Sequence, residues 1–463
     1  MKISKIEVKN NPVIGDLDLD FNFNGKIADN VLLIGNNGVG KTYLFENIID
    51  RFLHNGIPTA SDEIRMYEFQ LNKHESENLK NITTVGWFHK GIKGKTIKLI
   101  MSNEGRKISF SNDNSHEYTD LDLGRISGEF VQNFKFIFSG AEPNYRLKKV
   151  SSITKDSFDK ENFTAMSHDS QLGARNHQLL INTQFHDNQD LRNWIIDHPK
   201  KKIPKDVIDK RWNRLRKAFE KILPYGKNLK ELRETKDGWQ VYFEENGKDS
   251  SLENLSSGEK SLVHRTIQVL QNQEFSEGVI VSIDEPEKSL NPQTQIQLLN
   301  YFKELLNDQK GEQNGQIFMA SHSPYLFKQH LQDDNTVIYL LSKDSKGIIK
   351  YKNIKDTQEN LFPWSPSWGE VNYYAFDIPT VEFHNELYGY IEGKYRTDLK
   401  KLPKTKTWYN EKKKRNESVS LSTYIRHSIH HPENTANKTY SQNEFKKSIT
   451  EMIKIVKSKK TKK

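Results

Sequence analysis

Glycines followed by a lysine and a threonine form the first segment that could do chemistry. Residues 35–42 read Gly-Asn-Asn-Gly-Val-Gly-Lys-Thr and fit the pattern G-x-x-x-x-G-K-[ST]. In such a loop the backbone N–H groups surround phosphate oxygens, the lysine contacts the β- and γ-phosphates, and the hydroxyl binds Mg²⁺. We therefore expect ATP and Mg²⁺ as ligands, with nucleotide contacts from Asn36, Asn37, Gly38, Val39, Gly40, Lys41 and Thr42.

The segments on either side of this loop are the ones that phosphate binding needs. The apolar run 31–34 predicts a strand, and residues 43–49 predict a helix whose Leu44, Phe45 and Ile48 face a core. A helix N-terminus beside the glycines adds a dipole that favours anions. This context disfavours the plainer interpretation, a glycine turn next to a surface lysine.

Two acidic residues end a second apolar segment. Residues 279–283 predict a buried strand, and Asp284 and Glu285 follow where it would emerge beside the phosphates. Asp284 would hold Mg²⁺ together with Thr42, and Glu285 would orient or deprotonate the attacking water. Taken alone, such a pair also fits an ordinary turn at the end of a strand.

Two further segments have the same character. Leu255-Ser256-Ser257-Gly258-Glu259 precedes an apolar periodic run, so it predicts a helix start at which Ser256 and the amides near Gly258 could bind phosphate. By itself it would read as a helix cap. Residues 316–321 predict another strand, which ends at His322, and Ser289-Leu290-Asn291-Pro292 lies between this strand and Asp284.

The order of these segments resembles that of ABC-type, SMC-like ATPases, which are also grouped with AAA-like proteins. The resemblance implies that Lys41, Glu285 and His322 are catalytic, with His322 sensing the γ-phosphate. It also implies that Ser256 and Gly258 contact the nucleotide of a partner subunit, so the chain would form at least a head-to-tail dimer. Ser257 and Glu259 depart from the family's usual Gly and Gln. Gln132 is a candidate for the family's Q-loop by position alone.

The elements that would position these residues indicate an α/β fold, with an ATPase domain over residues 1–360. The interval between Thr42 and Leu255 has no sustained heptads, so we expect a short helical insertion at about 178–223 instead of a long coiled coil. Strands are expected at 83–87, 96–101 and 107–110. Residues 362–368 look like a rigid linker, and 361–463 form a smaller, mainly helical region.

Charge and composition limit the partners. From Ile391 to Lys463 the chain has 20 Lys and Arg against 7 Asp and Glu, a net charge of +13, so contact with nucleic acid through this region is one interpretation and a solvated basic end is the other. No apolar run approaches the roughly 20 residues of a membrane span. The absence of cysteine and the strand-like start fit a cytoplasmic protein without membrane contact.

Arg426 and His431 form an R-x4-H pattern near the end of an expected helix. The pattern resembles the catalytic motif of HEPN ribonucleases, in which an arginine could stabilise a pentavalent phosphate and a histidine could move protons. A structural helix end or partner-binding surface is the plainer interpretation. A metal site made by His427, His430 and His431 is a third.

The chain as a whole resembles the compact ATPases of bacterial antiphage systems such as PARIS, Septu and the retron-associated type. The resemblance implies a homo-oligomeric regulatory ATPase that senses infection and controls a toxic nuclease effector. Two alternatives stay open: an ATP-gated HEPN-type ribonuclease acting through Arg426 and His431, and an SMC-like DNA-binding repair ATPase.

Overall fold

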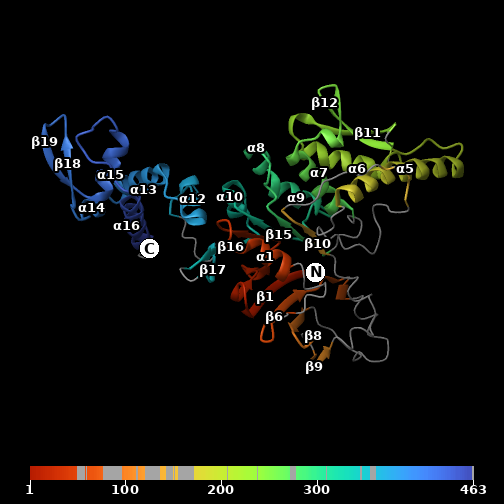
Figure 1. Ribbon diagram of the computed structural model, residues 1–463, viewed down its shortest axis with the longest axis horizontal. Coiled ribbons are helices and arrows are strands. Elements are labelled where there is room, and N and C mark those ends of the chain that lie inside the picture. Colours follow the sequence, from red (N-terminus) through yellow and green to blue (C-terminus); the bar gives the residue numbers. More distant parts are fainter. Residues whose placement is uncertain are drawn as a thin grey trace. The chain divides into compact units, whose positions relative to one another are not determined.

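The computed structural model describes residues 1–49, 58, 60–73, 75–76, 96–110, 113–119, 136–141, 150, 152–154, 172–205, 207–236, 238–271, 278–308, 310–344, 347–354, 361–365 and 367–460. The chain divides into two compact units, Met1–Lys352 and Asn353–Lys463. The second unit is drawn in blue at the end of the colour bar in Figure 1. The expected strand 83–87 and Gln132 lie outside the described residues. Among the described helices, none has the length and apolar character that a bilayer crossing requires.

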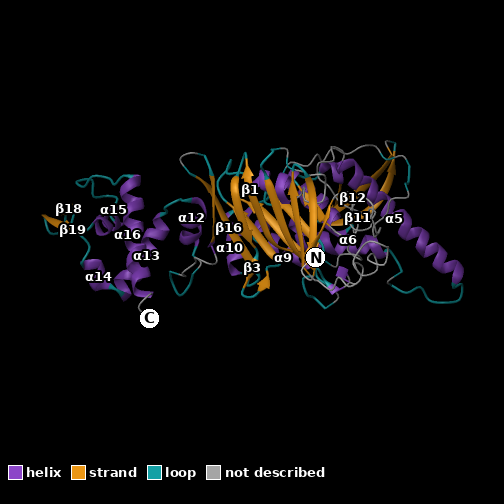
Figure 2. Cartoon of the chain, turned by 90° about the horizontal axis from the view of Figure 1, so that it is seen from below, coloured by secondary structure: helices purple, strands orange, loops and turns teal. Residues whose placement is uncertain are grey.

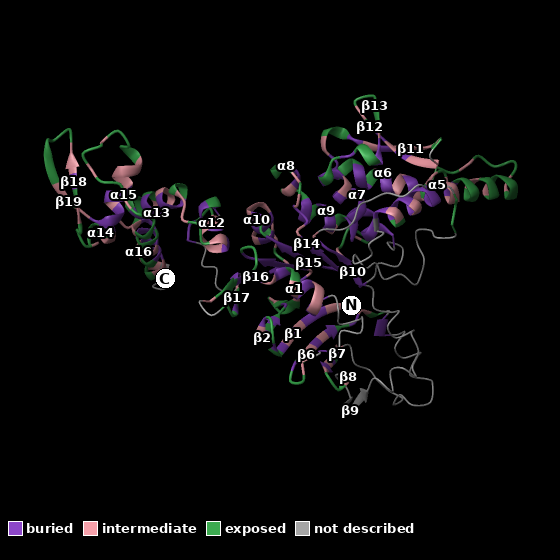
Figure 3. Cartoon of the chain, in the orientation of Figure 1, coloured by how far each residue is buried: buried purple, intermediate pink, exposed green. Residues whose placement is uncertain are grey.

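A mostly parallel sheet forms the centre of the first unit. Its strand order is β10-β14-β15-β5-β16-β17, and the pairs from β10 to β16 are parallel. The middle strands are apolar and completely buried, as a sheet covered on both faces requires, and they appear as buried ribbons in Figure 3. The bounds are β5 (Asn30–Ile34), β10 (Phe136–Ser139), β14 (Ile280–Asp284), β15 (Gln316–Ser321), β16 (Thr336–Lys343) and β17 (Ile349–Asn353).

A second, antiparallel sheet covers one face of the parallel one. Its order is β2-β1-β6-β7-β8-β9, and along β1 buried apolar residues such as Ile6 alternate with half-exposed charged ones such as Lys5 and Glu7. The two sheets share a core that includes Phe45, Tyr67 and Phe318. The bounds are β1 (Lys2–Asn11), β2 (Gly15–Asp20), β6 (Ile64–Gln70), β7 (Thr96–Ser102), β8 (Gly105–Phe110) and β9 (Asp113–Thr119), and a small pair is formed by β3 (Asn22–Phe23) and β4 (Lys26–Ile27). Figure 2 views these strands side by side.

Helices pack on the parallel sheet, and several of them follow its strands in the sequence. α1 (Lys41–Tyr43) follows β5 and runs into η1 (Leu44–Ile49), which has π-helical geometry and buries Leu44, Phe45 and Ile48 as expected. α10 contacts β5 and β16, and α7 contacts β10. The bounds of this group are α7 (Ser257–Leu270), α8 (Pro292–Gln295), α9 (Leu298–Leu305) and α10 (Pro324–Gln332).

The segment between the glycine-rich P-loop, residues 35–42, and α7 contains two helices and a small sheet. α5 (Leu172–Asp197) begins before the expected insertion and α6 (Lys210–Ile222) ends within it. Both pack on a three-stranded sheet that sequence reasoning did not anticipate: β11 (Asn228–Thr235), β12 (Gly238–Glu245) and β13 (Lys248–Ser251), joined to α6 by η2 (Pro224–Gly226) and to α7 by η3 (Leu252–Asn254).

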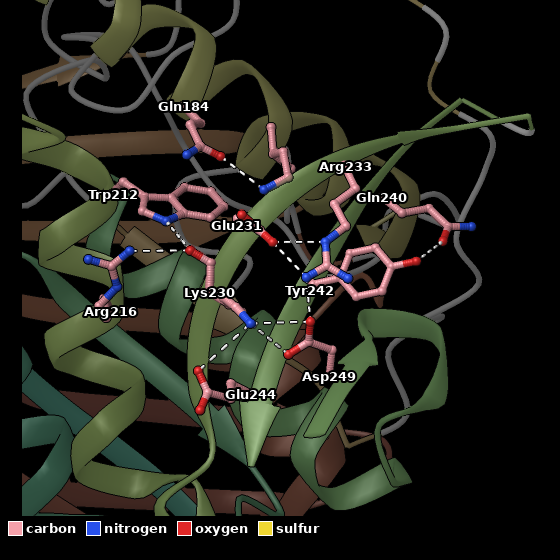
Figure 4. Close-up of polar contacts among 11 residues, drawn as sticks. Gln184, Trp212, Arg216, Lys230, Glu231, Arg233, Gln240, Tyr242, Glu244 and Asp249 are labelled. Atoms are coloured by element: carbon pink, nitrogen blue, oxygen red, sulfur yellow. Dashed lines mark hydrogen bonds and ion pairs between the residues drawn. The ribbon is translucent and has the colours of Figure 1, made fainter. Parts of the chain in front are cut away.

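Polar side chains fasten this small sheet (Figure 4). The Trp212 indole of α6 donates to the Lys230 carbonyl at 3.3 Å, and Gln184 of α5 accepts a hydrogen bond from the backbone of β11. The Arg233 guanidinium lies 4.4 Å from the centre of the Tyr242 ring and pairs with Asp249. The insertion is therefore a short, internally braced lobe.

The second unit is a helical bundle with one hairpin. Its helices are α12 (Trp368–Phe376), α13 (Val381–Lys394), α14 (Arg396–Lys400), α15 (Leu421–His430) and α16 (Gln442–Lys460), and its strands are β18 (Lys406–Asn410) and β19 (Arg415–Val419). The core includes Phe362, Phe383, Ile425 and Met452. The linker interpretation of 362–368 was wrong, because Phe362 is buried in this core and stacks on Trp364. The α/β class predicted from sequence, with its helical parts, is confirmed.

Candidate functional site

The glycine-rich loop connects the end of β5 to α1. Gly40 lies in the left-handed region at φ 96°, and a Cβ there would come within 2.5 Å of Ile349 Cδ1. A side chain at this position would be both strained and crowded, so glycine is required for the turn. Asn36, Asn37 and Gly38 are exposed along the loop, while Val39 is buried.

Lys41 is the cation of this loop. Its side chain is 6% exposed, and its Nζ donates hydrogen bonds to the carbonyls of Gly35 at 2.8 Å and Asn36 at 3.1 Å. Burial lowers the pKa of Lys41, and the nearby acids Glu285, Asp284 and Glu287 oppose this shift. The loop therefore encloses a positive charge that faces an acidic cluster.

Thr42 and Asp284 meet although 242 positions separate them in sequence. Because β5, β15 and β14 are parallel neighbours, their carboxyl ends lie at one edge of the sheet, and the Thr42 hydroxyl donates to Asp284 Oδ2 at 2.8 Å. Asp284 Oδ1 is buried without a hydrogen-bond partner among the described residues. Burial raises the pKa of Asp284 to about 6, while the Thr42 hydrogen bond acts in the opposite direction.

Glu285 and His322 also lie at this edge. Glu285 has φ 44°, a backbone conformation that is rare outside glycine, and its N–H donates to the Ala320 carbonyl of β15 at 2.9 Å. His322 Nδ1 lies 3.5 Å from Glu285 Oε1 and 3.4 Å from Glu287 Oε1. His322 is 44% exposed, so its ring is accessible from solution.

Glu287 is a site residue that sequence reasoning missed. It is 4% exposed and accepts hydrogen bonds from Ser321 Oγ at 2.7 Å and from the His322 N–H at 3.0 Å. The sequence does contain a signal that could have identified Glu287 as a site residue. It is an acidic residue three positions after Asp284, in the turn that directly follows a buried strand.

The segment 255–259 forms the start of α7. Ser256 is the N-cap: its side chain accepts from the Glu259 N–H, and Glu259 Oε2 accepts from the Ser256 N–H at 2.8 Å. The other Glu259 oxygen pairs with Lys227 at 2.5 Å, which fixes the helix start against β11. Ser256 is exposed.

Gly258 packs against the segment 289–292. A Cβ on Gly258 would meet the Ser289 carbonyl oxygen at 2.3 Å, so only glycine fits here. Gln295 donates to the Leu290 carbonyl at 2.8 Å and accepts from Ser323 Oγ at 2.7 Å. These bonds join the segment beside Gly258 to the residue that follows His322.

Arg265 of α7 contacts the same sheet edge. The side chain is 1% exposed, and its Nη2 donates to the carbonyls of Asp284 at 3.0 Å and Gly140 at 3.2 Å. The helix that begins at Ser256 is therefore bonded directly to the end of the acidic strand. Sequence reasoning did not single out this arginine.

In the second unit, Arg426 and His431 point to different neighbours. Arg426 Nη1 donates to Asn385 Oδ1 at 2.7 Å on α13, whereas His431 Nδ1 lies 3.2 Å from the Glu433 carboxylate. His427 packs against Trp408 at 5.2 Å between ring centres. Among the described residues no group of three His, Cys, Asp or Glu could hold a metal, so the metal site suggested for His427, His430 and His431 was wrong.

Comparison with known proteins relates the first unit to ATPases. Residues 180–327, which contain Ser256, Asp284, Glu285 and His322, match the family model described as an AAA ATPase domain. This match supports ATPase activity of the first unit. A chaperone protein ClpB from Mycoplasma genitalium is 27% identical over 163 residues, which cover 34% of this chain. The chain spans only 20% of the length of that curated relative.

Solved structures similar to the chain include SMC head domains. An SMC head bound to the C-winged helix domain of ScpA has a TM-score of 0.44 at 13% identity, covering 76% of this chain and 97% of that one. The SMC head domain from Thermotoga maritima has a TM-score of 0.38 at 12% identity, covering 76% and 99%.

Proposed function

We propose that this chain is a regulatory ATPase whose subunits assemble head to tail around ATP, and that the assembly controls a toxic nuclease effector in antiphage defence. The observation that supports assembly is a division of the predicted site. Lys41, Thr42, Asp284, Glu285 and His322 share one sheet edge, whereas the exposed Ser256 hydrogen-bonds within its own helix start and, among the described residues, to none of these five. A second subunit would bring the two halves together.

The sheet edge fits a magnesium-bound triphosphate. Thr42 Oγ1 and Asp284 offer hard oxygen ligands 2.8 Å apart, and Asp284 Oδ1 is buried without a hydrogen-bond partner among the described residues. A magnesium ion there would neutralise charge on the phosphates. Lys41 would bind the β- and γ-phosphates, Glu285 would orient or deprotonate water, and His322 would contact the γ-phosphate.

The partner's contribution would come from α7. This helix has 14 residues, and Ser256 and the amides up to Gly258 stand at its positive end. A γ-phosphate presented by a second subunit would be bound there by N–H groups and the Ser256 hydroxyl. The capping box and the Lys227–Glu259 pair hold this end in one conformation before it binds.

The shape of the insertion favours a scaffold over a tether. α5 and α6 form a short lobe closed by β11–β13, in place of the long arm with which a DNA-tethering relative would reach. The test is co-purification with the products of neighbouring genes, with and without ATP. We expect an ATP-dependent complex with a nuclease; a chain that recovers no partner under any nucleotide condition would contradict effector control.

The ribonuclease alternative receives little support from the second unit. His431 directly follows the last residue of α15 and has a non-helical backbone, and Arg426 and His431 engage Asn385 and Glu433, respectively. Incubating the purified chain with RNA, beside His431→Ala, tests this alternative. We expect no cleavage by either protein, and cleavage that disappears only in the variant would restore the ribonuclease hypothesis.

A further inference from the structure

A buried carboxylate lies behind the histidine that the proposed function assigns to γ-phosphate sensing. Glu287 follows β14 in a tight turn in which Lys288 N–H bonds to the Glu285 carbonyl at 3.1 Å and Leu290 N–H bonds to the Glu287 carbonyl at 3.0 Å. The turn directs the Glu287 side chain toward the end of β15, where Ser321 and His322 lie.

One oxygen of Glu287 contacts three polar atoms of two consecutive residues. Oε1 accepts from Ser321 Oγ at 2.7 Å and from the His322 N–H at 3.0 Å, and it lies 3.4 Å from His322 Nδ1. The backbone and the ring of His322 are therefore held by the same atom. With Nδ1 facing the Glu287 and Glu285 carboxylates, Nε2 is the ring nitrogen left for a ligand.

Stability does not account for a carboxylate at this position. A buried charge is costly unless it is paired and fully hydrogen-bonded. Glu287 Oε2 is buried and has no hydrogen-bond partner among the described residues, and within them His322 is the one basic side chain within 4.0 Å of Glu287. A neutral side chain of similar size would satisfy Ser321 at lower cost, so the charge is explained by its effect on His322.

We propose that Glu287 is a positioning residue for ATP hydrolysis. It fixes the His322 backbone and holds Nδ1 toward the protein, so that Nε2 is presented to the γ-phosphate. Glu287 itself touches no reacting atom and acts only through His322. This role rests on the proposed assignment of His322.

The test is Glu287→Gln combined with His322→Ala. Glutamine keeps the size of the side chain and can still accept from Ser321 Oγ and the His322 N–H, but it carries no charge. We expect kcat for ATP to fall at least tenfold with KM within twofold of the wild type. The double variant should be no slower than His322→Ala alone, because both changes remove the same function. Glu304→Gln, which alters an exposed carboxylate on α9, is the matched control and should keep wild-type kinetics.

Other outcomes would overturn the role. Independent losses that multiply in the double variant would assign Glu287 a structural effect, and so would a raised KM with unchanged kcat. If Glu287→Gln does not fold, Ser321→Ala replaces it: this removes one donor to the same oxygen and should lower kcat about threefold, again only when His322 is present. Failure to recover an effector would bear on the proposed function alone, since these assays need only the purified ATPase.

Discussion

The two units place their chemistry-bearing residues by different means. In the first, parallel strands end at one edge, so Thr42 and Asp284 touch across 242 positions of sequence. In the second, Arg426 lies within α15 and His431 follows its last residue, and the two side chains face different partners. Residues brought together by a sheet edge can make a site whatever their spacing in sequence, whereas residues that are close in sequence make one only when the local backbone turns their side chains toward each other.

The largest expected effect is at the P-loop. Lys41→Ala removes the buried cation that faces the acidic edge, so nucleotide affinity should fall at least 100-fold in a calorimetric titration, a loss of about 2.7 kcal/mol or more. Lys26→Ala removes an exposed lysine and serves as the control. Unchanged affinity in Lys41→Ala would mean that the sheet edge does not form the nucleotide site.

Glu285→Gln separates binding from turnover. The variant keeps the side-chain size but cannot accept a proton from water, so ATP should bind normally while steady-state hydrolysis drops by about 100-fold or more. Because ATP is then trapped, dimers or larger oligomers should accumulate in light scattering. Wild-type turnover in this variant would remove Glu285 from the catalytic role.

Gly258→Ala examines the second half of the proposed site. The added Cβ would meet the Ser289 carbonyl at 2.3 Å, so α7 or the 289–292 segment must shift, at a cost of about 1–3 kcal/mol in unfolding free energy. ATP should still bind one subunit, but ATP-dependent assembly should weaken. Assembly and turnover at wild-type levels would show that α7 does not contribute in trans.

Acid should weaken the second unit through a buried histidine. His384 is fully buried, its Nε2 lies 3.0 Å from Ser448 Oγ, and burial, with Arg426 and His430 nearby, lowers its pKa to about 3. Because the unfolded chain takes up this proton near pH 6.5, stability is complete above that pH and falls as the pH drops toward 3. The loss should be about 2 kcal/mol at pH 5.

Denaturant unfolding of the chain at pH 7 and pH 5, followed by a probe in the second unit, measures this loss. His384→Asn should reduce the pH dependence, with some loss of stability at pH 7. An equal pH dependence in the variant would mean that another group takes up the proton. His264 in the first unit, whose pKa burial also lowers to about 3, provides the comparison between the two units.

Sequence analysis predicted those parts of the molecule in which an apolar run is followed directly by residues that can bind or react. β5, β14 and β15 are such runs, and each ends at a residue that chemistry would use. Glu287 was missed because burial of an acidic residue is invisible until the neighbouring strand is placed. The hairpin of β18 and β19 was missed because its strands are short and largely polar, and Phe362 was misjudged because prolines and tryptophans suggested a linker.

The bonds from Ser323 through Gln295 to Leu290 have a further consequence. They join the segment that would sense a subunit's own ATP to the segment that packs against Gly258, which would serve the neighbour's ATP. In a head-to-tail assembly each subunit would then report its own nucleotide to the adjacent site. The order in which the subunits hydrolyse ATP, and not only the rate of hydrolysis, would then be a property of the whole assembly.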